Sequence, residues 1–178
     1  IHEIRKNRQP SKKLLYIGRY LDVKGIRELW TTFERLSDDF PEWELHCIGT
    51  GDLWDERAIH PKIVHHGFKQ PDELAAHLED AACFVMPSKK EPWGVVLHEM
   101  AIAGLPLLVS DQVGACSLFL QNELNGSTIQ HSQLESILIN FMKLPISKTR
   151  SMSQHSHRLG LSHTPTKWAE SCLQLIHS

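Results

Sequence analysis

Short apolar segments bounded by Gly, Pro or polar residues alternate along this chain with longer segments of helical periodicity. The apolar segments are typical of buried strands and span residues 14–18, 43–49, 63–68, 82–88, 107–110 and 125–130. The helical segments span residues 26–36, 71–81, 95–103, 132–144 and about 164–176, with short helices expected after residues 51 and 115. Strands that alternate with helices pair in parallel and carry helices on both faces. The sequence therefore predicts an α/β fold, a Rossmann-like doubly wound parallel sheet of about six strands.

The length of the chain fits one domain. With 178 residues, 41% of them hydrophobic and 22% charged, it can bury a sizeable core, and we assign residues 14–178 to a single domain. Basic residues crowd segment 1–13, which we interpret as a solvated linker, the alternative being contact with a membrane surface or another domain. The first residue is Ile1 rather than Met, so we expect a fragment whose remaining part lies upstream.

Charge and composition narrow the classes of partner. The net charge of -2 and the pI near 6.7 predict no general attraction to nucleic acid. No signal peptide and no apolar stretch of membrane-span length is evident. Four cysteines without a CxxC pair fit reduced thiols in a cytoplasmic protein. The inner face of the cell membrane is the alternative location. The twelve histidines include no HExxH motif, so we expect no metal and no other cofactor.

Helix 95–103 is the most apolar of the predicted helices. Seven of its nine residues are apolar, so we expect little of it to face water and Glu99 to lie inside an α/β layer, where a carboxylate is costly. The simpler interpretation is that Glu99 forms a salt bridge with a Lys or Arg. The alternative is a role in ligand binding that also involves Glu91, in the loop before the helix. The carboxylates of Glu91 and Glu99 would then flank a phosphate site.

The start of this helix supplies the centre of such a site. The N–H groups of Gly94, Val95 and Val96 would face an anion, and the helix dipole would strengthen its binding. A nucleotide sugar carries hydroxyl groups on both sides of its diphosphate, as two flanking carboxylates require. Arg19 and Lys24 follow the first strand, and ligands of such sheets bind at the carboxyl ends of strands. The alternative for these two cations is an exposed loop without a ligand.

Glu91 and Glu99, with seven residues between them and followed by AIAGLP and VSDQVGA, resemble the E-x7-E motif of family 4 (group 1) retaining GT-B glycosyltransferases. The resemblance covers roughly residues 14–129 by motif. It implies that this chain is the C-terminal, donor-binding half of a GT-B fold. It also implies retaining transfer of a sugar from a nucleotide-sugar donor to an acceptor glycan or glycolipid, which the missing N-terminal domain would mainly bind.

The resemblance also assigns roles to individual residues. It implies that Gly18, Arg19, Lys24 and Gly25 contact the donor diphosphate, that Gly49 and Gly51 allow close backbone approach, and that Gly67 and Lys69 lie near the nucleobase. Glu99 would hold ribose hydroxyls and Glu91 the donor sugar. Trp93, Gly94, Val95 and Val96 would complete the donor site, with Asp111, Gly114 and Ala115 nearby. The catalytic candidates are Glu91, Arg19 and Lys24.

Two questions stay open at this point. Glu91 could act as a nucleophile or could only position the donor. The alternatives for the whole function are another GT-B enzyme, such as a sugar-nucleotide epimerase or a phosphorylase, and a non-catalytic nucleotide-sugar-binding module. Product analysis would separate the enzymes. A pure module would have no need for Arg19, Lys24, Glu91 and Glu99 together.

Overall fold

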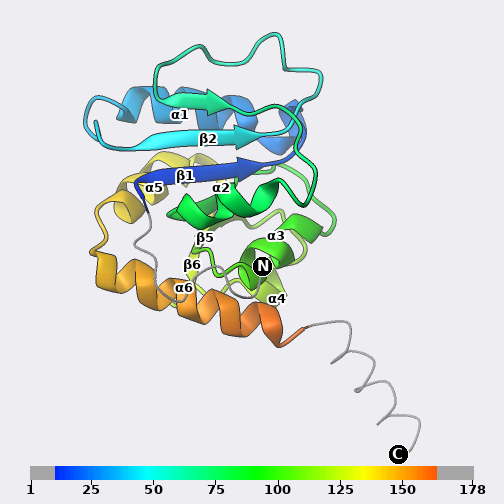
Figure 1. The fold of residues 1–178 in the computed structure, drawn as a ribbon, viewed down its shortest axis with the longest axis vertical. Coiled ribbons are helices and arrows are strands. Elements are labelled where there is room, and N and C mark those ends of the chain that lie inside the picture. The colour runs from blue at the N-terminus through cyan, green and yellow to red at the C-terminus, as the bar shows by residue number, and fades with distance from the viewer. Residues whose placement is uncertain (1–10, 164–178) are drawn as a thin grey trace, which may run out of the picture.

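The computed structural model of this chain describes residues 11–163, so the predicted helix at about 164–176 and residues 1–10 of the basic segment lie outside the described residues. Six strands form one parallel sheet in the order β3-β2-β1-β4-β5-β6 (Figure 1). The strands are β1 (Lys13–Ile17), β2 (Glu44–Ile48), β3 (Ile63–His65), β4 (Cys83–Met86), β5 (Leu107–Ser110) and β6 (Gly126–Ile129). This architecture confirms the predicted Rossmann-like sheet.

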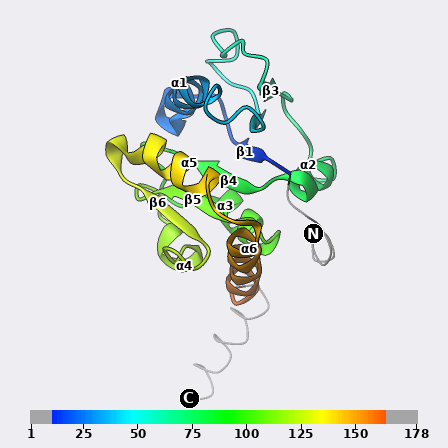
Figure 2. The same cartoon turned by 90° about the vertical axis from the view of Figure 1, so that its left-hand side faces the viewer.

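Helices cover both faces of the sheet (Figure 2). The α-helices are α1 (Ile26–Leu36), α2 (Leu74–Asp80), α3 (Val95–Ile102), α4 (Cys116–Phe119), α5 (Leu134–Met142) and α6 (Ile146–Leu161), with 3-10 turns at Asp22–Lys24 and His131–Gln133. Apolar side chains of α1 and α5 join one core, and those of α2, α3 and α4 join a second core on the opposite face. The chain is therefore doubly wound.

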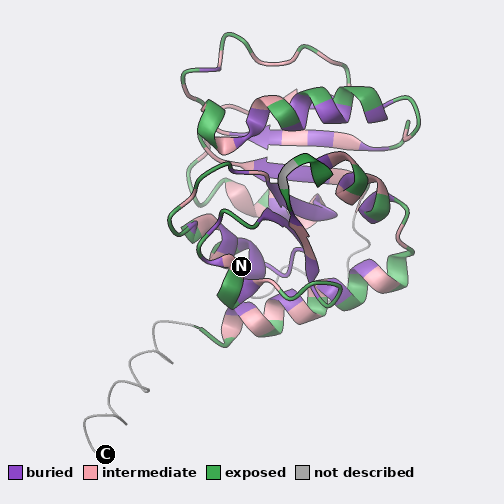
Figure 3. Cartoon of the chain, turned by 180° about the vertical axis from the view of Figure 1, so that it is seen from behind, coloured by how far each residue is buried: buried purple, intermediate pink, exposed green. Residues whose placement is uncertain are grey.

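The inner strands β4 and β5 are buried along their whole length because they are covered on both sides. In β1, Leu14 and Tyr16 belong to the core under α1 and α5, whereas Leu15 belongs to the core under α2 and α3. Successive side chains of a strand point to opposite faces, so a sheet buried on both faces needs continuous apolar runs. Figure 3 shows the central strands buried and the outer helix faces exposed. The thiols of Cys47 and Cys83 are buried.

Two elements have the predicted ends, and the ends of other elements shift. The helix at 26–36 and the strand at 107–110 have the predicted ends, whereas β3 stops at His65 rather than Phe68 and α2 begins at Leu74 rather than residue 71. The prediction of a short polar helix after residue 51 is wrong, because residues 51–62 form turns and irregular loop.

Helix α6 was not predicted. Its buried positions are Thr149, Met152, Ser156 and Gly160, which follow helical spacing but are mostly small or polar. It packs against α3, where Ser153 Oγ donates to the carbonyl of Gly104 and His157 Nδ1 lies 2.5 Å from the carbonyl of Ile102. Hydrogen bonds to carbonyls at the carboxyl end of α3 thus help to hold α6 in place, where other helices rely on an apolar face.

A buried polar cluster joins α6 to the loop between α4 and β6. Both Asn125 and Ser156 are fully buried. Asn125 Nδ2 donates to the carbonyl of Phe119 at 2.8 Å and to Ser156 Oγ at 3.1 Å, and Asn125 Oδ1 accepts from the N–H of Gln121 at 2.7 Å. One buried amide side chain therefore satisfies three polar groups.

Replacing Asn125 with alanine should lower the free energy of unfolding by about 2–4 kcal/mol, because buried partners lose their hydrogen bonds. Chemical denaturation of both forms measures the change. Asn122→Ala is the matched control: Asn122 Oδ1 also accepts two hydrogen bonds, from Thr128, but is exposed, so water can replace it. The control should cost less than about 1 kcal/mol. Equal losses in the two variants would contradict the role of burial.

Candidate functional site

The loop after β1 and the loop after β4 meet at the carboxyl edge of the sheet. The N–H of Lys89 donates to the carbonyl of Val23 at 2.9 Å. The ammonium of Lys89 also pairs with Asp22 at 2.8 Å and Glu28 at 2.5 Å. Parallel strands β1 and β4 are neighbours at the point where the strand order reverses, and ligands of doubly wound sheets bind at that point. The two loops thus build the rim of a candidate site.

Lys24 and Glu91 form an ion pair across this rim. Their side chains are only 19% and 15% exposed. Partial burial makes such a pair stronger than one in free solvent, and each charge orients the other. The structure therefore brings together one predicted phosphate ligand and one predicted sugar ligand that lie 67 residues apart in the sequence.

Gly25 permits this close approach. It has a φ of +68°, and a Cβ atom built on it would lie 2.1 Å from the carbonyl oxygen of Pro87. No larger residue fits there without moving one of the two loops, and the left-handed backbone itself favours glycine. Gly25 is thus a structural requirement for the meeting of Lys24 and Glu91.

The backbone of Glu91 is held by the loop after β5. Its N–H donates to the carbonyl of Gln112 at 3.1 Å, and its carbonyl accepts from the N–H of Gly114 at 3.1 Å. The N–H of Ala115 donates to the carbonyl of Trp93 at 2.9 Å. These bonds fix Glu91 from its main chain while its carboxylate stays at the rim. The side chain of Trp93 is 48% exposed beside it.

Helix α3 starts next to this carboxylate. Gly94 is its N-cap, and Leu97 donates the first helical hydrogen bond, to the carbonyl of Gly94 at 2.9 Å. The N–H groups of Val95 and Val96 precede that bond, so helix geometry leaves them without a helical acceptor. Val95 is 65% exposed, which opens the helix start to solvent. The arrangement suits an anion.

Glu99 is exposed, so the prediction that it lies inside an α/β layer is wrong. The apolar residues of α3 are not all buried: Leu97, Met100 and Ala101 face the core. Val95 and Glu99 are four residues apart and share the opposite, open face. The carboxylate of Glu99 therefore stays hydrated and carries no burial cost, one turn along the helix from Val95.

Arg19 is exposed at the end of β1. Its carbonyl accepts a hydrogen bond from the buried hydroxyl of Tyr16 at 2.9 Å, while its guanidinium has no ion-pair partner within residues 11–163. The pKa of Tyr16 is raised above its usual range, first by burial, then by the charges of Cys47 and Glu91. Tyr16 thus stays protonated and donates to the Arg19 backbone.

The glycines predicted to contact the donor after β1, β2 and β3 take part in backbone hydrogen bonds of these neighbouring segments. The N–H of Gly18 donates to the carbonyl of Ile48 at 3.0 Å, and the N–H of Gly49 donates to Gly67 at 2.7 Å. The carbonyl of Gly51 accepts from Trp54 at 2.9 Å. An added Cβ atom would lie 1.9 Å from the carbonyl oxygen of Gly18 at position 49 and 2.6 Å from that of Tyr20 at position 51, so close backbone contact explains the glycines Gly49 and Gly51 without a ligand.

Lys69 is engaged locally. Its ammonium pairs with Glu73 at 3.1 Å, and Glu73 also accepts from the N–H of Gln70 at 2.8 Å. In the part of the chain that the structure describes, no contact connects Lys69 to the Lys24–Glu91 pair. The structure gathers Gly25, Lys24, Glu91 and the start of α3, and leaves Lys69 in the neighbouring loop.

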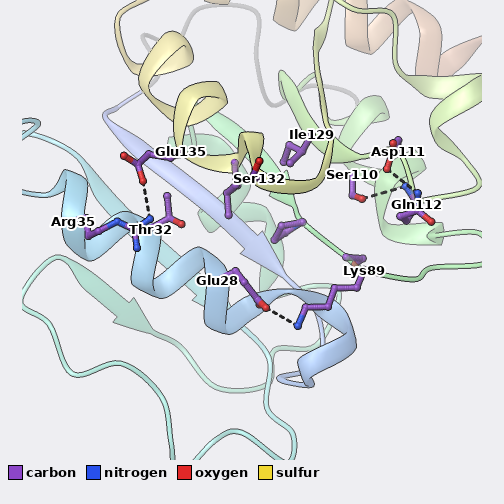
Figure 4. Close-up of a pocket in the computed structure, with 13 residues that line it drawn as sticks. Glu28, Thr32, Arg35, Lys89, Ser110, Asp111, Gln112, Ile129, Ser132 and Glu135 are labelled. Atoms are coloured by element: carbon purple, nitrogen blue, oxygen red, sulfur yellow. Dashed lines mark hydrogen bonds and ion pairs between the residues drawn. The ribbon is translucent and has the colours of Figure 1, made fainter.

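A cavity of about 560 Å³ lies between α1, α5 and the carboxyl ends of β4 and β5 (Figure 4). Ion pairs Arg35–Glu135 and Lys89–Glu28 lie along its wall, and Asp111 is part of its lining. The buried hydroxyl of Ser88, which also lines it, has no hydrogen-bond partner. None of the predicted donor ligands lines this cavity. Sequence reasoning missed it, because its walls come from segments far apart in the chain.

Comparison with known proteins places the chain in a family. The family model described as glycosyl transferases group 1 matches residues 1–156. An uncharacterized glycosyltransferase of Methanocaldococcus jannaschii is 30% identical over 134 residues, which is 71% of this chain and 34% of that protein. The chain spans about a third of the length of the curated relatives it matches. No helix among the described residues combines the length and the apolar character that crossing a membrane requires.

Solved structures share the fold. A mutant of S. aureus TarM, crystallised with fondaparinux, alpha-GlcNAc-glycerol and UDP, has a TM-score of 0.85 at 21% identity, covering 100% of this chain and 38% of that chain. The C-terminal domain of a group 1 family glycosyl transferase (LpcC) from Francisella tularensis has a TM-score of 0.74 at 18% identity. That match covers 89% of this chain and 93% of the other, so the likeness extends over almost a whole separately crystallised domain.

Proposed function

Because the chain belongs to the group 1 glycosyl transferases, we propose that it binds a nucleoside-diphosphate sugar at the rim formed by the loops after β1 and β4. The observation that carries this proposal is the ion pair of Lys24 and Glu91 beside the open start of α3. A cation, a carboxylate and free N–H groups within one rim match the groups of such a donor: diphosphate, sugar hydroxyls and ribose hydroxyls.

The diphosphate would lie against the start of α3. The N–H groups of Val95 and Val96, the ammonium of Lys24 and the guanidinium of Arg19 would share its negative charges. When the sugar–phosphate bond breaks, the diphosphate leaves with additional negative charge. Preorganised donors at that position stabilise the departing group more than the bound donor, and this difference accelerates the reaction.

The two glutamates would bind hydroxyls at the ends of the donor. Glu91 pairs with Lys24 in this structure. In our proposal the Lys24 ammonium binds a donor phosphate instead, and the Glu91 carboxylate accepts hydrogen bonds from the sugar. Glu99, which is exposed on α3, would accept hydrogen bonds from the ribose hydroxyls. We propose retention of configuration at the anomeric carbon, with attack on the face from which the diphosphate leaves.

The whole protein would supply what this chain lacks. We propose that the acceptor, a glycan or glycolipid, is bound mainly by an N-terminal domain, because the curated relatives are about three times as long as the matched part. This chain alone would then bind the donor with little or no turnover. A cytoplasmic location, with contact at the inner face of the membrane through the basic segment 1–13, is part of the same proposal.

The direct test is a thermal-shift screen of this chain against UDP-, GDP- and ADP-sugars. A ligand that binds only the folded state raises the melting temperature. We expect one nucleotide class to raise it, and UDP is the first to test because a structural neighbour was crystallised with UDP. No shift with any of the three classes, at concentrations that saturate ordinary donor sites, would contradict donor binding.

Replacing Lys24 with alanine should weaken binding of the identified donor by about 10- to 100-fold, because a charge-assisted bond to phosphate is lost. Isothermal titration gives the dissociation constants. Lys12→Ala is the matched control: Lys12 also pairs with a glutamate, Glu42, but at the amino end of β1, on the opposite edge of the sheet. Unchanged affinity in Lys24→Ala, or an equal loss in Lys12→Ala, would remove Lys24 from the site.

A further inference from the structure

Three histidines from three separate elements meet on the sheet face that α2 covers. His46 lies in β2, His66 directly follows β3, and His77 lies in α2. Each offers a ring nitrogen, and these three nitrogens all lie within 4.8 Å of one another. From this geometry we propose that His46, His66 and His77 form a binding site for a divalent transition-metal ion, with Zn²⁺ as the expected ion.

The distances fit a metal with imidazole ligands. His66 Nε2 and His46 Nδ1 are 3.0 Å apart, and the ring centroids of His66 and His77 are 4.3 Å apart. With Zn–N bonds of about 2.0–2.1 Å, two nitrogens of a tetrahedral site lie roughly 3.3–3.4 Å apart. The His46 and His66 nitrogens would therefore separate by a few tenths of an ångström, the His77 nitrogen would complete the set from within 4.8 Å of both, and water would take the remaining position.

Glu44 orients the first of these rings. Its carboxylate Oε2 lies 2.9 Å from His46 Nε2. A carboxylate can only accept, so Nε2 carries the proton and Nδ1 presents a lone pair to the cluster. A carboxylate behind a ligating histidine fixes its tautomer and increases its basicity, as at many zinc sites.

The nearby cations are already neutralised. Lys13 pairs with Asp80 at 3.0 Å, and Lys69 pairs with Glu73 at 3.1 Å. Imidazole binds metals in its neutral form, and these two ion pairs reduce the repulsion that the lysines would exert on the ion.

The site would fasten a weakly packed helix. In α2 only Leu78 is buried, and Leu74 packs partly buried against the same core, so few apolar side chains hold this helix to the sheet. A metal ion bound by His77 and by two residues of the β2–β3 edge would tie this helix to the sheet. Metal binding that requires the folded arrangement adds its free energy to folding.

The test uses this chain after treatment with EDTA. Isothermal titration with ZnCl₂ should show one tight site, and Co²⁺ at the same site should give visible d–d absorption. His77→Gln and His66→Asn should each weaken Zn²⁺ binding at least about 100-fold, and Glu44→Gln about 10-fold. Zn²⁺ should raise the melting temperature of the unmodified chain but not that of His77→Gln.

His155→Gln is the matched control, because His155 lies on α6 beside Gln121 and outside the cluster. It should bind Zn²⁺ as the unmodified chain does. Melting curves of the metal-free variants establish that each is folded. Absence of Zn²⁺ binding to the unmodified chain would overturn the proposal. Binding that is unchanged in both His77→Gln and His66→Asn would overturn it too, because the ion would then occupy other histidines.

Discussion

Replacing Glu91 with glutamine in the whole protein is expected to lower kcat by about 100- to 1000-fold and to change the donor KM far less. A preorganised charged group at the reacting centre contributes about this much to turnover. Glutamine keeps the size of the side chain and removes its charge. The side chains of Lys24 and Glu91 are only 19% and 15% exposed, so loss of their pair should also lower stability, and a melting curve of the variant establishes that it is folded. The measurement is release of free nucleotide during transfer, once the donor and acceptor are known.

The matched control for this variant is Glu42→Gln. Glu42 also pairs with a lysine, Lys12, but at the amino edge of the sheet, so its loss should leave kcat unchanged. A rise in KM at constant kcat in Glu91→Gln would assign Glu91 to donor binding alone. Unchanged kcat and KM would remove it from the site. A covalent sugar adduct on Glu91, found by mass spectrometry, would identify it as a nucleophile rather than a positioning group.

The architecture could be predicted because it depends on repeating local patterns. Short apolar runs alternating with amphipathic segments permit few folds other than a doubly wound parallel sheet. In such a sheet the loops after the strands share one edge, so the position of their loops after two strands already indicated that Lys24 and Glu91 lie at the same edge. The sequence predicted only that the two residues share one edge of the sheet. The structure adds their ion pair and the role of Gly25.

Features that depend on partners distant in sequence were wrong or missed. Glu99 was expected to be buried because its helix is apolar, yet a short helix on one sheet face still has an open side. Helix α6 was missed because Thr149, Ser156 and Gly160 give its buried face no apolar periodicity. The cluster of His46, His66 and His77 follows no short metal motif, since topology rather than spacing brings its members together.

Replacing Gly25 with alanine is expected to lower the free energy of unfolding by about 2–5 kcal/mol. The left-handed backbone at a φ of +68° costs an alanine about 1–2 kcal/mol. The added Cβ would also lie 2.1 Å from the carbonyl oxygen of Pro87, and forcing two packed backbones apart costs about 1–3 kcal/mol more. Urea denaturation of the two forms gives the difference in free energy.

Gly67→Ala separates these two costs. Gly67 has the same φ of +68°, but the nearest atom to its added Cβ, in the side chain of Trp54, is 3.9 Å away. This control should therefore lose only the backbone contribution of about 1–2 kcal/mol. The excess in Gly25→Ala measures how tightly the loops after β1 and β4 are joined. If the two variants lost equal stability, the contact with Pro87 would carry no cost, and Lys24 and Glu91 would have to be held together by other means.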